Sequence, residues 1–164
     1  MKEEKKVSEV ELQQQAVFLQ QCRKLLQAEY PVELPLAYVH SFGCQQNVSD
    51  GERIKGILAE MGYGFTDSAE TAELVIFNTC AVRENAEDRV FGNLGALKKI
   101  KRERPSMRIG LCGCMPQQEH ITERVKKSFP YVDLIFGTHV LYRLPELLYR
   151  TLAKEQKHII NIEA

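Results

Sequence analysis

The sequence predicts an α/β domain built on a flavodoxin-like open parallel sheet, with strand order 2-1-3-4-5, helices on both faces and an N-terminal helical extension. Short apolar runs alternate with amphipathic helical patterns along residues 36–155. Such alternation is typical of a parallel sheet covered by helices. Three of the apolar runs are followed directly by a cysteine, at Cys44, Cys80 and Cys114. In the predicted order those three strands are neighbours, so the cysteines are expected to converge at one sheet edge.

Residues 1–35 are expected to form an extension made of one amphipathic helix and a linker. Apolar side chains recur there with helical spacing, at Phe18, Cys22, Leu25 and Leu26. The pattern predicts a helix over about residues 8–28, with Cys22 packed on its apolar stripe and its Gln-rich face in solvent. Pro31 and Pro35 indicate a linker that is not helical throughout.

The main domain is expected to span residues 36–155. Strands are predicted at residues 36–42, 63–66, 74–78, 108–111 and 133–137. Helices are predicted at about residues 49–61, 84–104, 117–129 and 140–154. Ser49, with Glu52 three residues later, is a capping-box pattern that places the start of the first of these helices at Ser49. Residues 156–164 are expected to begin a linker, although residues 158–162 also have a strand-like composition.

Composition limits the class of protein. The 22 basic and 22 acidic residues cancel, which argues against a protein that binds nucleic acid by bulk electrostatics. Neither a signal-peptide pattern nor an apolar run of about 18 residues is present, so we expect a cytoplasmic protein with no membrane contact. Disulfides are rare in that compartment, which favours structural, catalytic or metal-binding roles for the five cysteines. Glycine-rich dinucleotide and P-loop motifs are missing from the sequence.

Cysteines at the ends of neighbouring strands point to metal chemistry. Adjacent strands lie about 4.8 Å apart, so three thiols on neighbouring loops are able to ligate one cluster. Gly43 and Gly113 stand beside two of the thiols and allow backbone amides to approach anionic sulfides. Spacing alone leaves three alternatives open. They are a zinc site with Cys112 or a histidine as fourth ligand, a Cys112–Cys114 redox pair, and a non-catalytic α/β binding module whose thiols only pack.

Three segments resemble the signatures of the methylthiotransferase N-terminal domain, in the same order and spacing. They are Gly-Cys-Gln-Gln-Asn at residues 43–47, Asn-Thr-Cys-Ala-Val-Arg-Glu-Asn-Ala-Glu at residues 78–87, and Gly-Cys-Met-Pro-Gln at residues 113–117. The resemblance covers about residues 36–153. The second segment is typical of the MiaB-type branch, which adds a methylthio group to isopentenylated adenosine next to the anticodon of tRNA. Branches that modify threonylcarbamoyl-adenosine or a ribosomal protein usually carry other residues at the first segment, and remain alternatives.

The resemblance implies that Cys44, Cys80 and Cys114 ligate an auxiliary [4Fe-4S] cluster whose open iron holds the sulfur for the product. It also implies, for the full-length enzyme, a radical-SAM domain with a second [4Fe-4S] cluster and S-adenosylmethionine, a C-terminal RNA-binding domain, and tRNA as partner. The Cys-x-x-x-Cys-x-x-Cys motif of radical-SAM enzymes is absent from these 164 residues. We therefore expect a fragment that is inactive alone, and assign no catalytic residue in it.

Four further residues are assigned to the surroundings of the cluster: Gly43, Asn47, Asn78 and Gly113. The two asparagines either steady the cluster loops or satisfy ordinary loop and cap hydrogen bonds. Cys112 has no counterpart in the resemblance and is not expected to be a ligand. The basic run over residues 98–104 is interpreted as a solvated helix face, with contact to tRNA as the alternative.

Overall fold

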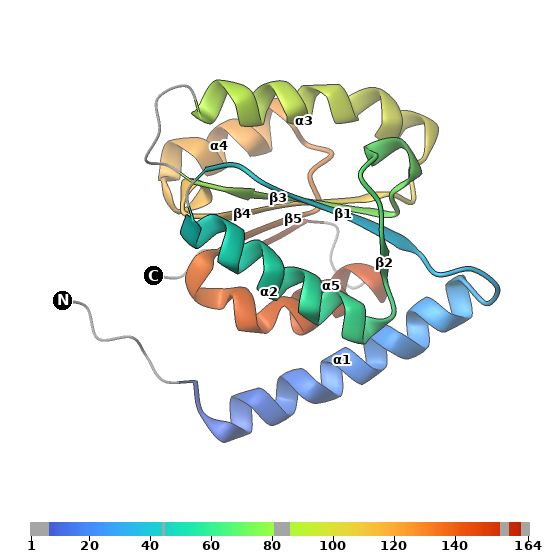
Figure 1. The fold of residues 1–164 in the computed structure, drawn as a ribbon. Coiled ribbons are helices and arrows are strands. Elements are labelled where there is room, and N and C mark those ends of the chain that lie inside the picture. The colour runs from blue at the N-terminus through green and yellow to red at the C-terminus, as the bar shows by residue number, and fades with distance from the viewer. Residues whose placement is uncertain (1–6, 44, 81–85, 155–157, 162–164) are drawn as a thin grey trace.

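The computed structural model of the protein describes residues 7–43, 45–80, 86–154 and 158–161. Over these ranges the chain forms a six-stranded parallel sheet in the order β2-β1-β3-β4-β5-β6, with helices on both faces (Figure 1). The strands are β1 (Leu36–Ser41), β2 (Gly64–Phe65), β3 (Leu74–Thr79), β4 (Arg108–Gly113), β5 (Leu134–Gly137) and β6 (Ile159–Asn161). The predicted fold class and strand order are confirmed, and β6 extends the sheet beyond β5.

The helices form layers above and below the sheet. They are α1 (Glu9–Glu29), α2 (Gln45–Met61), α3 (Ala86–Glu103), α4 (Glu119–Ser128) and α5 (Leu144–Leu152), with short 3-10 helices η1 (Ala69–Thr71), η2 (Met115–Gln117) and η3 (Thr138–Arg143). Helices α3 and α4 cover one face, and α2 and α5 cover the other, with α1 lying outside them (Figure 1). Since both faces are covered, all six residues of the central strand β3 are buried.

Two helix starts differ from the predicted ones. Helix α2 begins at Gln45, four residues before Ser49, so the predicted capping box lies inside the helix and caps nothing. Gly43, two residues after the end of β1 and two before the start of α2, has a left-handed backbone with φ of 128°, which glycine adopts readily. The last predicted helix splits into η3 and α5, and Pro145 lies in the first turn of α5, where its missing N–H costs no hydrogen bond.

The N-terminal helix α1 is a packed layer of the molecule. Cys22 and Leu26 are buried in the same apolar cluster as α2 and α5. The Cys22 thiol donates to the Pro145 carbonyl oxygen at 3.3 Å, which confirms the predicted packing role of this cysteine. Gln15 differs from the expected solvated Gln-rich face, because it is buried and its Oε1 accepts from the backbone N–H of Glu146 at 3.1 Å.

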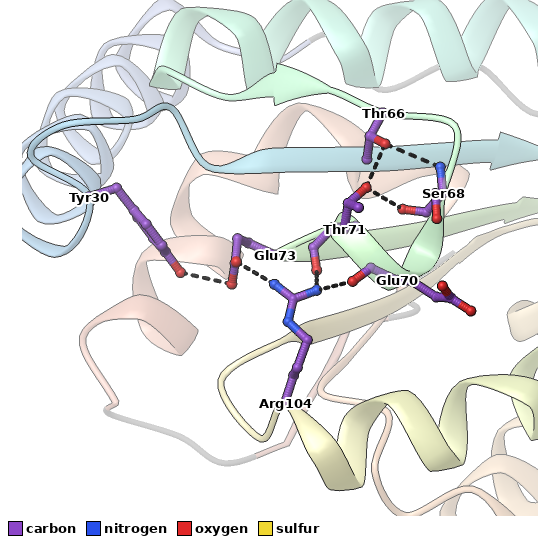
Figure 2. Close-up of polar contacts among 8 residues, drawn as sticks. Tyr30, Thr66, Ser68, Glu70, Thr71, Glu73 and Arg104 are labelled. Carbon is purple, nitrogen blue, oxygen red and sulfur yellow. Dashed lines mark hydrogen bonds and ion pairs between the residues drawn. The ribbon is translucent and has the colours of Figure 1, made fainter.

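A polar network fastens the amino ends of the strands, opposite the edge that carries the cysteines (Figure 2). Arg104, just after α3, donates to the carbonyl oxygens of Glu70 and Ala72 and pairs with the Glu73 carboxylate. The Tyr30 hydroxyl donates to the same carboxylate at 3.1 Å. One arginine therefore links the end of α3, the start of β3 and the linker that follows α1. None of the described helices is long and apolar enough to cross a bilayer.

Candidate metal centre

Two of the three predicted ligands lie at the ends of adjacent strands. Cys80 directly follows β3 and Cys114 directly follows β4, and the last residues of these strands, Thr79 and Gly113, are paired in register. Cys80 is buried, whereas Cys114 is exposed. The third predicted ligand, Cys44, lies outside the described residues, and β1 ends three residues before it, beside β3.

The connection between Thr79 and Gly113 positions the loop that carries Cys114. The backbone N–H of Cys114 donates to the Thr79 carbonyl oxygen at 3.1 Å, and the Thr79 hydroxyl donates to the Cys112 carbonyl oxygen at 2.7 Å. Gly113 has φ of 106°, and a Cβ at this position would lie 2.1 Å from the Thr79 carbonyl oxygen. Only glycine fits both this backbone conformation and this close approach.

Asn78 lies beneath the cysteine edge and bridges its two neighbouring strands. It is 1% exposed, its Nδ2 donates to the Ser41 hydroxyl at 3.2 Å, and its Oδ1 accepts from the Cys112 thiol at 3.8 Å. Burial, together with the nearby Asp50 carboxylate, raises the pKa of the Cys112 thiol and keeps it neutral. A thiol with a raised pKa is a poor nucleophile, which argues against a Cys112–Cys114 redox pair.

Of the other residues predicted to surround the cluster, the structure describes Gly43 and the backbone of Asn47. Gly43 has the left-handed backbone noted above, and the preceding Phe42 N–H donates to the Asn78 carbonyl oxygen at 2.8 Å. Asn47 lies in the first turns of α2, and its side chain is outside the described part of the structure. Arg83 and Glu84 also lie outside it.

Sequence reasoning missed several contributors. Ser41 and Thr79 support the cysteine edge, yet each resembles an ordinary strand residue, and only the strand register reveals its partner. Within the basic run, Lys101 pairs with Asp133 at 3.0 Å, whereas Lys98, Lys99 and Arg102 are exposed, as expected of a solvated face. The sequence of α3 does not predict that Lys101 is paired, because its partner Asp133 lies 32 residues away in the chain.

The donor chemistry at this edge suits an iron–sulfur cluster. Cysteine thiolates are the usual protein ligands of such clusters, and Cys80 and Cys114 are presented on two adjacent strands. Within the described ranges, which omit Cys44, the side chains of His, Cys, Asp and Glu form no group of three that could hold a metal ion. Fold and site therefore define an open parallel α/β domain with thiols at the carboxyl edge, beside the point where the strand order reverses.

The chain belongs to the Uncharacterized protein family UPF0004, whose model matches residues 36–137. Three relatives carry the name tRNA-2-methylthio-N(6)-dimethylallyladenosine synthase. The one from Acetivibrio thermocellus is 54% identical over 70% of this chain and 24% of its own length. The one from Clostridium perfringens is 47% identical over 82% of this chain and 31% of its own length. The one from Bacillus pumilus is 53% identical over 68% of this chain and 22% of its own length.

These matches confirm the predicted resemblance to the N-terminal domain of MiaB-type methylthiotransferases. The chain spans between 22% and 31% of the length of these relatives.

Proposed function

We propose that this chain is the auxiliary [4Fe-4S] cluster domain of a tRNA methylthiotransferase, with Cys44, Cys80 and Cys114 as the three protein ligands. The observation that carries the proposal is the placement of Cys80 and Cys114 directly after the paired ends of β3 and β4. When bound, such a cluster supplies one iron without a protein ligand, where the sulfur destined for the product is held.

The chain's own residues hold and shape this site. Cys80 contributes a buried thiol and Cys114 an exposed one, so the site faces the protein interior on one side and the surroundings on the other. Thr79 and Gly113 join the strand ends that precede Cys80 and Cys114, and Gly43 directly precedes Cys44 in the sequence. Because the thiols must lose their protons to bind metal, cluster binding is expected to weaken as the pH falls.

The rest of the proposal concerns the full-length enzyme. It includes a radical-SAM domain with a second [4Fe-4S] cluster and S-adenosylmethionine, a C-terminal RNA-binding domain, and a cytoplasmic location. The substrate is an isopentenylated adenosine next to the anticodon of tRNA, in keeping with the names of the relatives. The domain that holds the auxiliary cluster spans residues 36–155 in this proposal.

Anaerobic reconstitution of the 164-residue chain with iron and sulfide tests the ligand assignment. Wild-type protein is expected to bind about four irons and four sulfides per chain and to absorb visible light by sulfur-to-iron charge transfer. The substitutions Cys44→Ala, Cys80→Ala and Cys114→Ala are each expected to abolish stable binding. Cys112→Ala and Cys22→Ala, at buried thiols outside the proposed ligand set, are expected to retain the full stoichiometry.

Two results would contradict the proposal. Full cluster binding by Cys80→Ala would remove this cysteine from the ligand set. A wild-type chain that folds normally yet takes up neither iron nor sulfide would favour the non-catalytic binding module.

A chimera tests the substrate. The matching segment of a full-length relative is replaced by residues 36–137 of this chain, and both the nucleosides from tRNA and the ribosomal proteins are analysed by mass spectrometry. We expect the methylthio group on isopentenylated adenosine. Its appearance on threonylcarbamoyl-adenosine or on a ribosomal protein instead would place the chain in another branch.

A further inference from the structure

Three polar side chains form a line across the sheet just beneath the cysteine edge. Ser41 on β1, Asn78 on β3 and Cys112 on β4 are partners in strand register. Hydrogen bonds join them, from Asn78 Nδ2 to the Ser41 hydroxyl at 3.2 Å and from the Cys112 thiol to Asn78 Oδ1 at 3.8 Å. We call Ser41, Asn78 and Cys112 the transverse ladder.

Each member of the transverse ladder lies near the carboxyl end of a strand, two or three residues before the proposed ligand that follows that strand. Ser41 stands three residues before Cys44, whereas Asn78 and Cys112 each stand two residues before Cys80 and Cys114. The ladder therefore spans the three strands that carry ligands and no others. On the far side, Cys112 is in register with Phe136 of β5, an apolar residue that ends the line.

We propose that the transverse ladder is a positioning device for the cluster, in which Cys112 acts as a hydrogen-bond donor to Asn78 and is not a ligand. This inference rests on the proposed function. It gives a role to a cysteine that the sequence comparison with the family leaves unexplained. Through Asn78, Cys112 fixes the alignment of β3 and β4, and thereby the relative positions of Cys80 and Cys114.

The physical argument begins with the cost of burying polar groups. Asn78 lies in a strand whose six residues are all buried, where an apolar side chain would pack without needing hydrogen-bond partners. A buried amide is favoured only while its partners are in place, so it selects one alignment of the strands. Sliding β3 by a single residue moves its ligand by about 3.3 Å and breaks both ladder bonds, whereas sliding β1 or β4 breaks one of them.

Helix α2 closes over the transverse ladder. Gly51 of α2 is buried, and a Cβ at this position would lie 2.4 Å from the Ser41 hydroxyl oxygen. Asp50, its neighbour in α2, is 7% exposed. Helix α2, which begins at the residue after Cys44 in the sequence, is thus packed against the ladder.

The test uses the reconstituted 164-residue chain and compares Cys112→Ala with Cys112→Ser. Both variants are expected to bind wild-type amounts of iron. Cys112→Ala is expected to lose iron to a chelator about tenfold faster, the effect of about one lost buried hydrogen bond, and to show a changed electron paramagnetic resonance spectrum after reduction. Cys112→Ser keeps a donor to Asn78 and is expected to lie closer to wild type in both measurements.

Cys22→Ala is the matched control. Cys22 is likewise a buried thiol that donates to an oxygen, but its acceptor is the Pro145 carbonyl in α5, away from the transverse ladder. This variant is expected to keep the wild-type rate of iron loss and the wild-type spectrum. If Cys112→Ala does not fold, Ser41→Ala removes the acceptor at the other end of the ladder and is assessed by the same two measurements.

The outcomes separate this inference from the proposed function. A wild-type chain without iron overturns the proposed function and the inference with it. Wild-type iron content together with unchanged iron loss and spectrum in Cys112→Ala, or in Ser41→Ala where that variant replaces it, overturns the inference alone. Loss of iron stoichiometry in Cys112→Ala, to the level of Cys80→Ala, would make Cys112 a ligand and also overturns it.

Discussion

At the scale of single residues, burial decides what each cysteine is able to do. Cys22 and Cys112 are enclosed by apolar side chains, and desolvation raises the pKa of Cys22 to about 12 and that of Cys112 in the same direction. Both are neutral donors at neutral pH. Cys114, in contrast, is exposed at the edge of the sheet, where its thiol is accessible to a metal.

The partial burial of His40 is expected to make the stability of the fold depend on pH. His40 lies half-buried on β1 with its ring edge-on to Phe42 at 4.5 Å, and burial, together with the positive charge of Arg89, lowers its pKa. A histidine with a lowered pKa in the folded state stabilises the fold above its unfolded pKa of about 6.5, and this contribution is lost as the pH falls through the folded value. Urea unfolding of the apo chain is expected to show lower stability at pH 5 than at pH 7.5.

Replacement of His40 isolates this contribution. His40→Gln is expected to reduce the dependence of stability on pH, whereas substitution of the exposed His139 by Gln leaves it as in wild type. Equal pH dependence in His40→Gln and wild type would show that other groups account for the effect.

At the scale of elements, the close contact of β3 and β4 at their carboxyl ends determines the geometry of the proposed site. Thr79 and Gly113 are register partners, and two hydrogen bonds from this region hold the start of the Cys114 loop. The adjoining strand β1 is tied in through the Phe42 N–H. The ends of β1, β3 and β4, which precede the three proposed ligands, are therefore joined to one another.

Gly113→Ala tests this contact. The added methyl group meets the Thr79 backbone at 2.1 Å in a left-handed conformation, so a loss of at least about 2 kcal/mol in the free energy of unfolding is expected. The matched control is Gly56→Ala, at an exposed position inside α2 where the new Cβ has no atom within 4 Å apart from its chain neighbours and the backbone of its own helix. This control is expected to gain about 0.5–1 kcal/mol. Similar denaturant midpoints for the two variants would contradict the close approach.

At the scale of the whole molecule, α1 completes one face of the fold. Its residues Cys22 and Leu26 belong to the apolar cluster beneath α2 and α5, and Gln15 satisfies a backbone N–H at the start of α5. The linker after α1 is held by Tyr30 on Glu73 and by the ion pair of Glu29 with Arg108 at 3.9 Å. The segment before the family match, residues 1–35, is thus joined to the core at Gln15 within α1 and at Glu29 and Tyr30 at the end of α1.

Leu26→Ala tests whether α1 unfolds together with the sheet. The side chain is 2% exposed, so its removal is expected to lower the free energy of unfolding by about 2–5 kcal/mol in a single transition. Leu12→Ala, on the same helix at 52% exposure, is expected to change it by no more than about 0.5 kcal/mol. Circular dichroism and fluorescence transitions that separate in Leu26→Ala would show that α1 unfolds independently.

Much of the architecture follows from local patterns in the sequence. The apolar run at Leu74–Thr79 and the helical spacing in α3 reflect preferences of neighbouring residues, and the alternation of such runs predicts a parallel sheet and its order. The position of the cysteines after the strands is also local, since it depends only on where each apolar run stops. Local patterns were less informative for helix starts, because α2 begins at Gln45 and the capping signal of Ser49 falls inside the helix.

By itself, the sequence determined the fold class, the family and the placement of Cys80 and Cys114 at one sheet edge. Only the tertiary structure decided that Cys112 donates to Asn78, 34 residues away, that Gln15 caps α5, and that α1 is a packed layer. The physical reason is that these contacts join residues far apart in the chain. Their existence depends on strand register and on how helices pack, neither of which is encoded in the periodicity of any single segment.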